Sequence, residues 1–162
     1  MNCDFLNLLF RLAQAKVDFV VVGGFAAIVH GCTLVTQDID VCCDFGAENL
    51  LRLQSAVADL HPVHRMTPNR LALTLTPETA RHYNNLYLDT DAGQLDCIGE
   101  VKGIGGFEQV MRNSQRLKIE DQEFWVLDVD ALIQAKTAMN RPHDREAVNQ
   151  LETLKRLGGK QK

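Results

Sequence analysis

Two adjacent glycines between a β-branched run and a short apolar segment constrain the fold of this 162-residue chain more than any other feature. Residues 17–22 predict a β-strand because valine and phenylalanine favour extended backbone. Gly23 and Gly24 predict a sharp turn, since residues without a Cβ atom allow tight bends and a close approach of backbone N–H groups to an anion. Residues 25–30 predict a short helix that stops at a glycine. Strand, turn and helix in direct succession favour an α/β fold.

Two aspartates open the next predicted strand, residues 38–43. Because alternate side chains of a strand point to the same face, Asp38 and Asp40 share one small volume. Such carboxylates repel each other, so the pair indicates a cation or a buried proton. Hard oxygen ligands favour Mg²⁺ or Mn²⁺ over zinc. With Asp96 further along the chain as a third carboxylate, the pattern predicts a divalent metal site.

These residues carry a resemblance to a known family. The run Val-Val-Val-Gly-Gly-Phe-Ala-Ala at 20–27 and the run Thr-Gln-Asp-Ile-Asp-Val at 36–41 resemble the active-site signature of the nucleotidyltransferase superfamily, which has the DNA polymerase β-like fold. More closely, the chain is similar to small bacterial and archaeal members related to AbiEii-type toxins of toxin–antitoxin systems. The similarity is strongest over 17–41 and continues more loosely through 94–101 and 132–144.

The resemblance implies an enzyme that moves a nucleoside monophosphate from a nucleoside triphosphate to a hydroxyl group of RNA, protein or a small molecule. Asp38, Asp40 and Asp96 would be the catalytic residues and the ligands of Mg²⁺ or Mn²⁺. In the family, the first two carboxylates hold both metal ions, and the third completes the acceptor-side site and helps to deprotonate the nucleophile. The toxin resemblance also implies a cognate antitoxin as a partner. Asp44 and Glu100 are the alternatives for the third carboxylate.

Four residues are candidates for nucleotide binding: Gly23, Gly24, Thr36 and Lys136. Thr36 could bond phosphate or metal-bound water, although the polarity of a turn explains it equally well. Many relatives carry a basic residue before the acidic pair, where this chain has Leu34 in the corresponding stretch. Phosphate neutralisation would then need another source of positive charge.

Lys136 is the predicted source of that charge. Together with Arg141 it resembles the C-terminal Lys and Arg-x-x-Asp pattern of the family, in which Asp144 supplies the last position. The hypothesis is that Lys136 contacts the triphosphate. The alternative is a surface lysine whose aliphatic stem packs on the core.

Two other functions remain open at this point. The chain could be a catalytically weak or inactive nucleotide-binding or partner-binding module of the same fold, because the usual basic contact is missing. It could also be a structural protein whose acidic residues are incidental. Binding of nucleotide and Mg²⁺ without turnover would favour the module, and a thermal shift unaffected by either would favour the structural protein.

Length and composition favour one domain. An apolar content of 46% suits one globular domain. The resemblance implies a single nucleotidyltransferase-like domain over 1–157, with a mixed α/β sheet flanked by helices as its core over 17–126. A C-terminal helical segment is predicted over 128–157, in which the last helix covers 145–157. Residues 158–162 are predicted to form a tail.

Charge and hydropathy exclude several functions. A formal net charge of −4 and a pI near 5.7 argue against a protein that coats nucleic acid without specificity. No apolar run reaches the roughly 20 residues that span a bilayer, so we expect no membrane partner. Five cysteines without a Cys-x-x-Cys pair fit reduced thiols and a cytoplasmic location.

Overall fold

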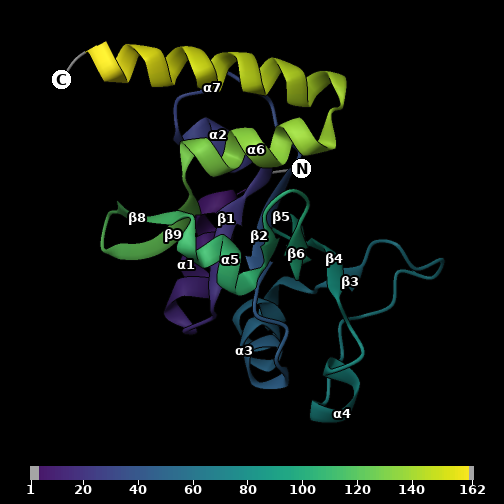
Figure 1. Cartoon of the computed structure of the whole chain (residues 1–162). Coiled ribbons are helices and arrows are strands. Elements are labelled where there is room, and N and C mark those ends of the chain that lie inside the picture. Colours follow the sequence, from purple (N-terminus) through teal and green to yellow (C-terminus); the bar gives the residue numbers. More distant parts are fainter. Residues whose placement is uncertain (1–3, 161–162) are drawn as a thin grey trace.

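The computed structural model describes residues 4–160, in which a mixed sheet is flanked by helices (Figure 1). The main sheet has the strand order β3-β4-β5-β2-β1-β9-β8. Its strands are β1 (Phe19–Val22), β2 (Asp38–Cys43), β3 (Val63–His64), β4 (Asn85–Thr90), β5 (Gly93–Ile98), β8 (Ser114–Ile119) and β9 (Gln122–Leu127). A separate two-stranded ribbon is formed by β6 (Glu100–Val101) and β7 (Gly105–Gly106). The predicted α/β class with a mixed sheet is therefore confirmed.

The helices of the described residues surround this sheet, and some of them pack on other helices. They are α1 (Phe5–Gln14), α2 (Gly23–Val29), α3 (Ala47–Val57) with the 3₁₀ turn Ala58–Leu60, α4 (Pro77–Ala80), α5 (Phe107–Arg112), α6 (Val129–Met139) and α7 (Pro142–Lys160). Figure 1 shows α7 as the outermost helix, lying along α6, while α3 and α4 lie toward the opposite end of the molecule. Within residues 4–160, no helix is long and apolar enough to cross a membrane.

The centre of the sheet is the part that positions the acidic residues. All four residues of β1 are buried, as expected for a strand covered on both faces. β1 runs antiparallel to β2 and parallel to β9, and β2 runs parallel to β5. The helix α1 covers this region with Leu8, Leu9 and Leu12, which are fully buried at helical spacing. Side chains on β2 and β5 are therefore held by well-packed neighbours.

The ends of two helices differ from the prediction. α2 begins at Gly23 itself, so the glycines are its first residues and not a separate turn before it. α7 begins at Pro142, because proline is accommodated in the first turn of a helix, and it continues to Lys160. The predicted tail over 158–162 therefore begins as helix. Residues 161–162 lie outside the part of the chain that the structure describes.

Candidate metal and nucleotide site

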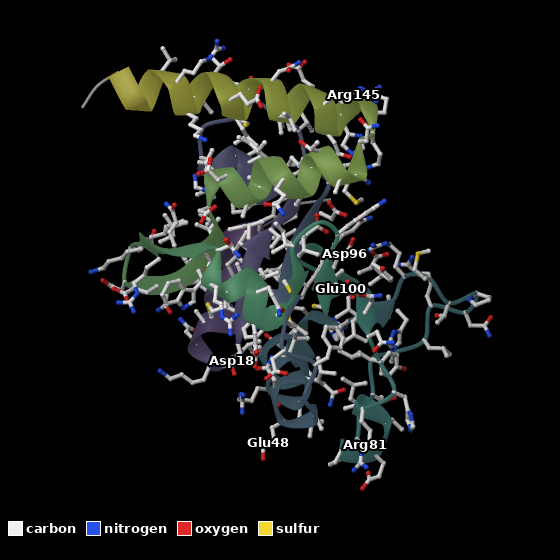
Figure 2. The ribbon with its side chains drawn as sticks, in the orientation of Figure 1. Asp18, Glu48, Arg81, Asp96, Glu100 and Arg145 are labelled. Atoms are coloured by element: carbon white, nitrogen blue, oxygen red, sulfur yellow. The ribbon has the colours of Figure 1, made fainter. Side chains whose placement is uncertain are left out.

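Three aspartates converge on one face of the sheet, and we call Asp38, Asp40 and Asp96 the acidic cluster. Asp40 on β2 is the register partner of Asp96 on the parallel strand β5, and Asp38 lies two residues earlier on the same face. One carboxylate oxygen from each residue lies within 4.8 Å of the other two. Figure 2 shows Asp96 toward the end of the sheet that α6 covers, whereas Asp18 and Glu48 lie toward the other end.

The acidic cluster is electrostatically strained without a cation. Burial, followed by the charges of Asp38 and Asp96, raises the pKa of Asp40 to about 7. Burial also raises the pKa of Asp96, although a contacting arginine offsets part of this effect. A divalent cation would remove the repulsion, and three carboxylates form a hard oxygen donor set of the kind that Mg²⁺ and Mn²⁺ prefer. The donor chemistry of the cluster therefore fits such an ion.

The raised pKa of Asp40 predicts how stability depends on pH. The folded chain holds this proton up to about pH 7, whereas the unfolded chain releases it near its usual value of about 3.9. The free energy of unfolding should therefore fall as the pH rises from about 4 to 7, because the folded state binds more protons in this range. Without metal, we expect Tm to fall more steeply between pH 5 and pH 7.5 in the wild type than in Asp40→Asn. Superimposable Tm curves for the two proteins would contradict this assignment.

Gly23 makes room for the acidic cluster. Its φ angle is +71°, and a Cβ atom added there would lie 2.2 Å from Oδ2 of Asp40. Val22, the preceding residue, is the register partner of Asp40 on the neighbouring antiparallel strand, so the chain turns directly beside this carboxylate. The sequence predicts an approach of backbone to an anionic ligand at this glycine. The structure adds a separate reason for glycine, which is the space that Asp40 occupies.

We predict that Gly23→Ala destabilises the protein and disturbs the acidic cluster. The left-handed backbone alone costs an alanine about 1 to 2 kcal/mol, and the contact with Asp40 adds to this cost. Thermal unfolding and Mn²⁺ binding measure the two effects. The matched control is Gly158→Ala in α7, where a new Cβ meets no atom within 4 Å and a gain of up to about 1 kcal/mol is expected. Equal stability of the two variants would contradict the argument.

Thr36 supports the start of β2. Its hydroxyl donates a hydrogen bond to the Asp38 carbonyl oxygen at 2.9 Å and lies 3.4 Å from Oδ1 of the same residue. A Cβ atom at Gly24 would lie 3.2 Å from the Thr36 hydroxyl, so Gly24 and Thr36 are also close neighbours. Leu34, in the stretch where a basic residue was expected, packs against the hydrophobic core. The nucleotide-binding candidates of the N-terminal half therefore adjoin the acidic cluster.

Lys136 is buried, so the alternative of a surface lysine is wrong. Its side chain on α6 is 9% exposed, and its Nζ lies 3.7 Å from Oδ1 of Asp144. Asp144 also accepts hydrogen bonds from Arg141, from Nε at 2.6 Å and from the backbone N–H at 3.2 Å. Burial opposes ionisation, but the bonds from Arg141 and the nearby charges hold the pKa of Asp144 below its usual range. Lys136 also offsets part of the rise in the pKa of Asp40, which places its charge near the acidic cluster.

Sequence reasoning missed Arg65, which contacts the acidic cluster directly. Its Nη2 donates to Oδ1 of Asp96 at 2.5 Å. Arg65 directly follows β3, a strand of only two residues, in a segment without clear periodicity. No local pattern in the sequence therefore indicates this contact. Among the described residues, the alternatives for the third carboxylate, Asp44 and Glu100, lie outside the group of three that could hold a metal.

The fold of the chain matches solved nucleotidyltransferases. The lincosamide antibiotic adenylyltransferase LnuA, solved with lincomycin bound, is 16% identical with a TM-score of 0.60, covering 95% of this chain and 99% of that chain. A Thermotoga maritima protein with a provisional nucleotidyltransferase assignment is 14% identical with a TM-score of 0.58, covering 92% of both chains. ANT(2″)-Ia in complex with adenylyl-2″-tobramycin is 13% identical with a TM-score of 0.55, and the match covers 93% of this chain and 91% of that chain.

Similarity at the level of sequence is much weaker. No family model and no curated protein sequence matches the chain. The conclusion therefore comes from three-dimensional likeness over more than nine-tenths of the chain. The protein has the nucleotidyltransferase fold.

Proposed function

We propose that this protein is a metal-dependent nucleotidyltransferase that moves a nucleoside monophosphate from a nucleoside triphosphate to a hydroxyl group of a small molecule. The observation that carries the proposal is the convergence of Asp38, Asp40 and Asp96 on two neighbouring strands of a nucleotidyltransferase fold. Burial and the neighbouring carboxylates also raise the pKa of Asp40 to about 7, and shifts of this kind are frequent at functional sites.

In such a reaction the protein forms no covalent bond to the substrate, and it acts mainly by positioning groups and stabilising charge. The acceptor oxygen forms a bond to the α-phosphorus, the bond from that phosphorus to the bridging oxygen breaks, and pyrophosphate leaves. Mg²⁺ or Mn²⁺, when bound, neutralises phosphate charge and aligns the attacking and leaving oxygens. Asp38 and Asp40 would hold both ions on the rigid strand β2. Asp96 would complete the acceptor side of the site and receive the proton of the acceptor hydroxyl.

Positive charge for the triphosphate would come from α6 and from the segment that follows it. Lys136 is held by Asp144 with its charge near Asp40. Arg141 is fixed by the same carboxylate, and its pKa is raised in part by Asp40 and Asp38, after the larger effect of Asp144. Asp144 would therefore orient two cations toward the phosphates. This arrangement would replace the basic residue that is missing from the stretch around Leu34.

A small-molecule acceptor is the class that the solved neighbours favour. LnuA was solved with lincomycin and ANT(2″)-Ia with an adenylylated tobramycin. An acidic chain with a net charge of −4 is also poorly suited to holding a polyanion such as RNA. The AbiEii resemblance supports a second acceptor class, an RNA end or a protein, with a cognate antitoxin as partner. Among the residues that the structure describes, four cysteines are buried free thiols, which fit a reducing cytoplasm for either reaction.

Transfer of label from nucleoside triphosphates tests the proposal. Each triphosphate is labelled at the α-phosphate or the γ-phosphate and incubated with Mg²⁺ and separate pools of lincosamides, aminoglycosides, RNA and protein. We expect α-label, and not γ-label, to appear on a small molecule, and chelation of the metal to abolish it. Label on RNA or protein would favour the toxin reaction. Tight binding of nucleotide without transfer to any pool would favour an inactive binding module.

A further inference from the structure

The side chain of Arg65 has two partners besides Asp96. Its Nη1 donates to the carbonyl oxygen of Leu88 at 3.0 Å and lies 3.5 Å from Oδ1 of Asp89. Asp89 in turn pairs with Arg70 from the same loop. The side chain of Arg65 is 20% exposed. The guanidinium is held by one carbonyl oxygen and two carboxylates, and moving it would leave Asp96 without its charged partner.

Arg65 also lies in the same row of the sheet as the acidic cluster. Its backbone N–H donates to the carbonyl oxygen of Tyr87 at 2.8 Å, which extends the pairing of β3 with β4 by one residue. Tyr87 is the register partner of Asp96, and Asp96 is the partner of Asp40. Residues in register across a sheet point to the same face. The backbone therefore fixes the guanidinium beside the third carboxylate.

Within residues 4–160, Arg65 is the cation that forms an ion pair with the acidic cluster. Lys136 is nearby, but its ion pair is with Asp144. A divalent cation that binds without nucleotide would therefore encounter one carboxylate, that of Asp96, which is already paired with a positive charge. A unit charge within about 5 Å of a divalent ion changes its affinity on the order of tenfold, even at the dielectric constant of water.

We propose that Arg65 makes cation binding at the acidic cluster depend on the nucleotide. The guanidinium on Asp96 opposes a bare divalent cation, and the negative charge of a bound triphosphate outweighs that opposition. Metal would then enter with the nucleotide and not before it. The inference rests on the proposed function, since it concerns the regulation of the same site. Arg65 is a positioning residue here, because it acts through Asp96.

Titration with Mn²⁺, followed by electron paramagnetic resonance at fixed pH and ionic strength, tests the inference without relying on turnover. In the wild type, we expect weak binding of Mn²⁺ alone and much tighter binding with a non-hydrolysable triphosphate analogue. In Arg65→Met, the affinity for Mn²⁺ alone should rise on the order of tenfold. The site of this variant should then fill without nucleotide at Mn²⁺ concentrations at which the wild type requires it. Arg65→Gln, which keeps a donor for the Leu88 carbonyl, should behave in the same way if the methionine variant does not fold.

Two further variants separate charge from general disruption of the loop. Arg65→Lys keeps the positive charge and should bind Mn²⁺ alone as the wild type does. Arg70→Met removes an equal positive charge, but one that pairs with Asp89 and not with the acidic cluster. This variant should also leave the affinity for Mn²⁺ alone unchanged. Unchanged or weaker binding of Mn²⁺ to both charge-removing variants at Arg65 would overturn the inference. Failure of the wild type to bind Mn²⁺ even with nucleotide would instead overturn the proposed function.

Discussion

Asp40→Asn and Asp38→Asn are each expected to lose nucleotidyl transfer by about three orders of magnitude or more, because cation charge stabilisation supplies several kcal/mol of such a barrier. An amide keeps the shape of the carboxylate but removes its charge. The fold should persist, since asparagine at either position also removes repulsion within the acidic cluster. Transfer of α-label measures activity, and circular dichroism with Tm measures folding.

The matched control for this pair is Asp44→Asn. Asp44 follows β2 immediately, but it lies outside the group of three carboxylates, and its Oδ1 accepts a hydrogen bond from the Gly46 backbone N–H at 3.0 Å. Asparagine can still accept that bond, so activity should stay within about twofold of the wild type. Full activity of Asp40→Asn in a correctly folded protein would remove the acidic cluster from the mechanism.

Asp144→Ala is expected to lower the free energy of unfolding by about 3 to 5 kcal/mol, the usual cost of breaking a buried ion pair. Asp144 is fully buried, and its loss would leave Lys136 with a buried charge and no carboxylate partner. Denaturant unfolding measures the effect. Binding of the triphosphate should weaken as well, because both proposed phosphate-binding cations depend on Asp144 for their positions.

An exposed ion pair on the same two helices provides the control. Lys155 and Asp130 lie 2.6 Å apart with side chains that are 57% and 72% exposed. Asp130→Ala should therefore cost no more than about 1 kcal/mol. The double variant Lys136→Met, Asp144→Leu should recover much of the lost stability without restoring nucleotide affinity. A small effect of Asp144→Ala, similar to that of Asp130→Ala, would contradict the role of Asp144.

The local part of the fold could be predicted from the sequence. The bounds of β2 agree with the prediction, because alternation along a strand is a local signal. The convergence of Asp38 with Asp40 follows from strand geometry alone. That Asp96 joins them requires β5 to pair in parallel with β2 and in this register. The resemblance to the family suggested this arrangement, whereas periodicity did not.

The contacts made by Arg65 and Lys136 could not be predicted in the same way. Arg65 reaches Asp96 across 31 positions of the chain, through a strand of two residues that no periodicity marks. Lysine is rarely buried, and the burial of Lys136 arises because α6 lies between α7 and the rest of the molecule. Both contacts depend on how distant elements pack, which residue types alone do not determine.

The most direct test of the account is a crystal structure with Mn²⁺ and a non-hydrolysable triphosphate, in which anomalous scattering locates the metal. We predict a peak bound by Asp38 and Asp40 at about 2.1 Å from their oxygens, with Asp96 beside it and the phosphates on the side of Lys136. A fully occupied nucleotide with its metal elsewhere, or no metal peak among these carboxylates, would contradict the central claim.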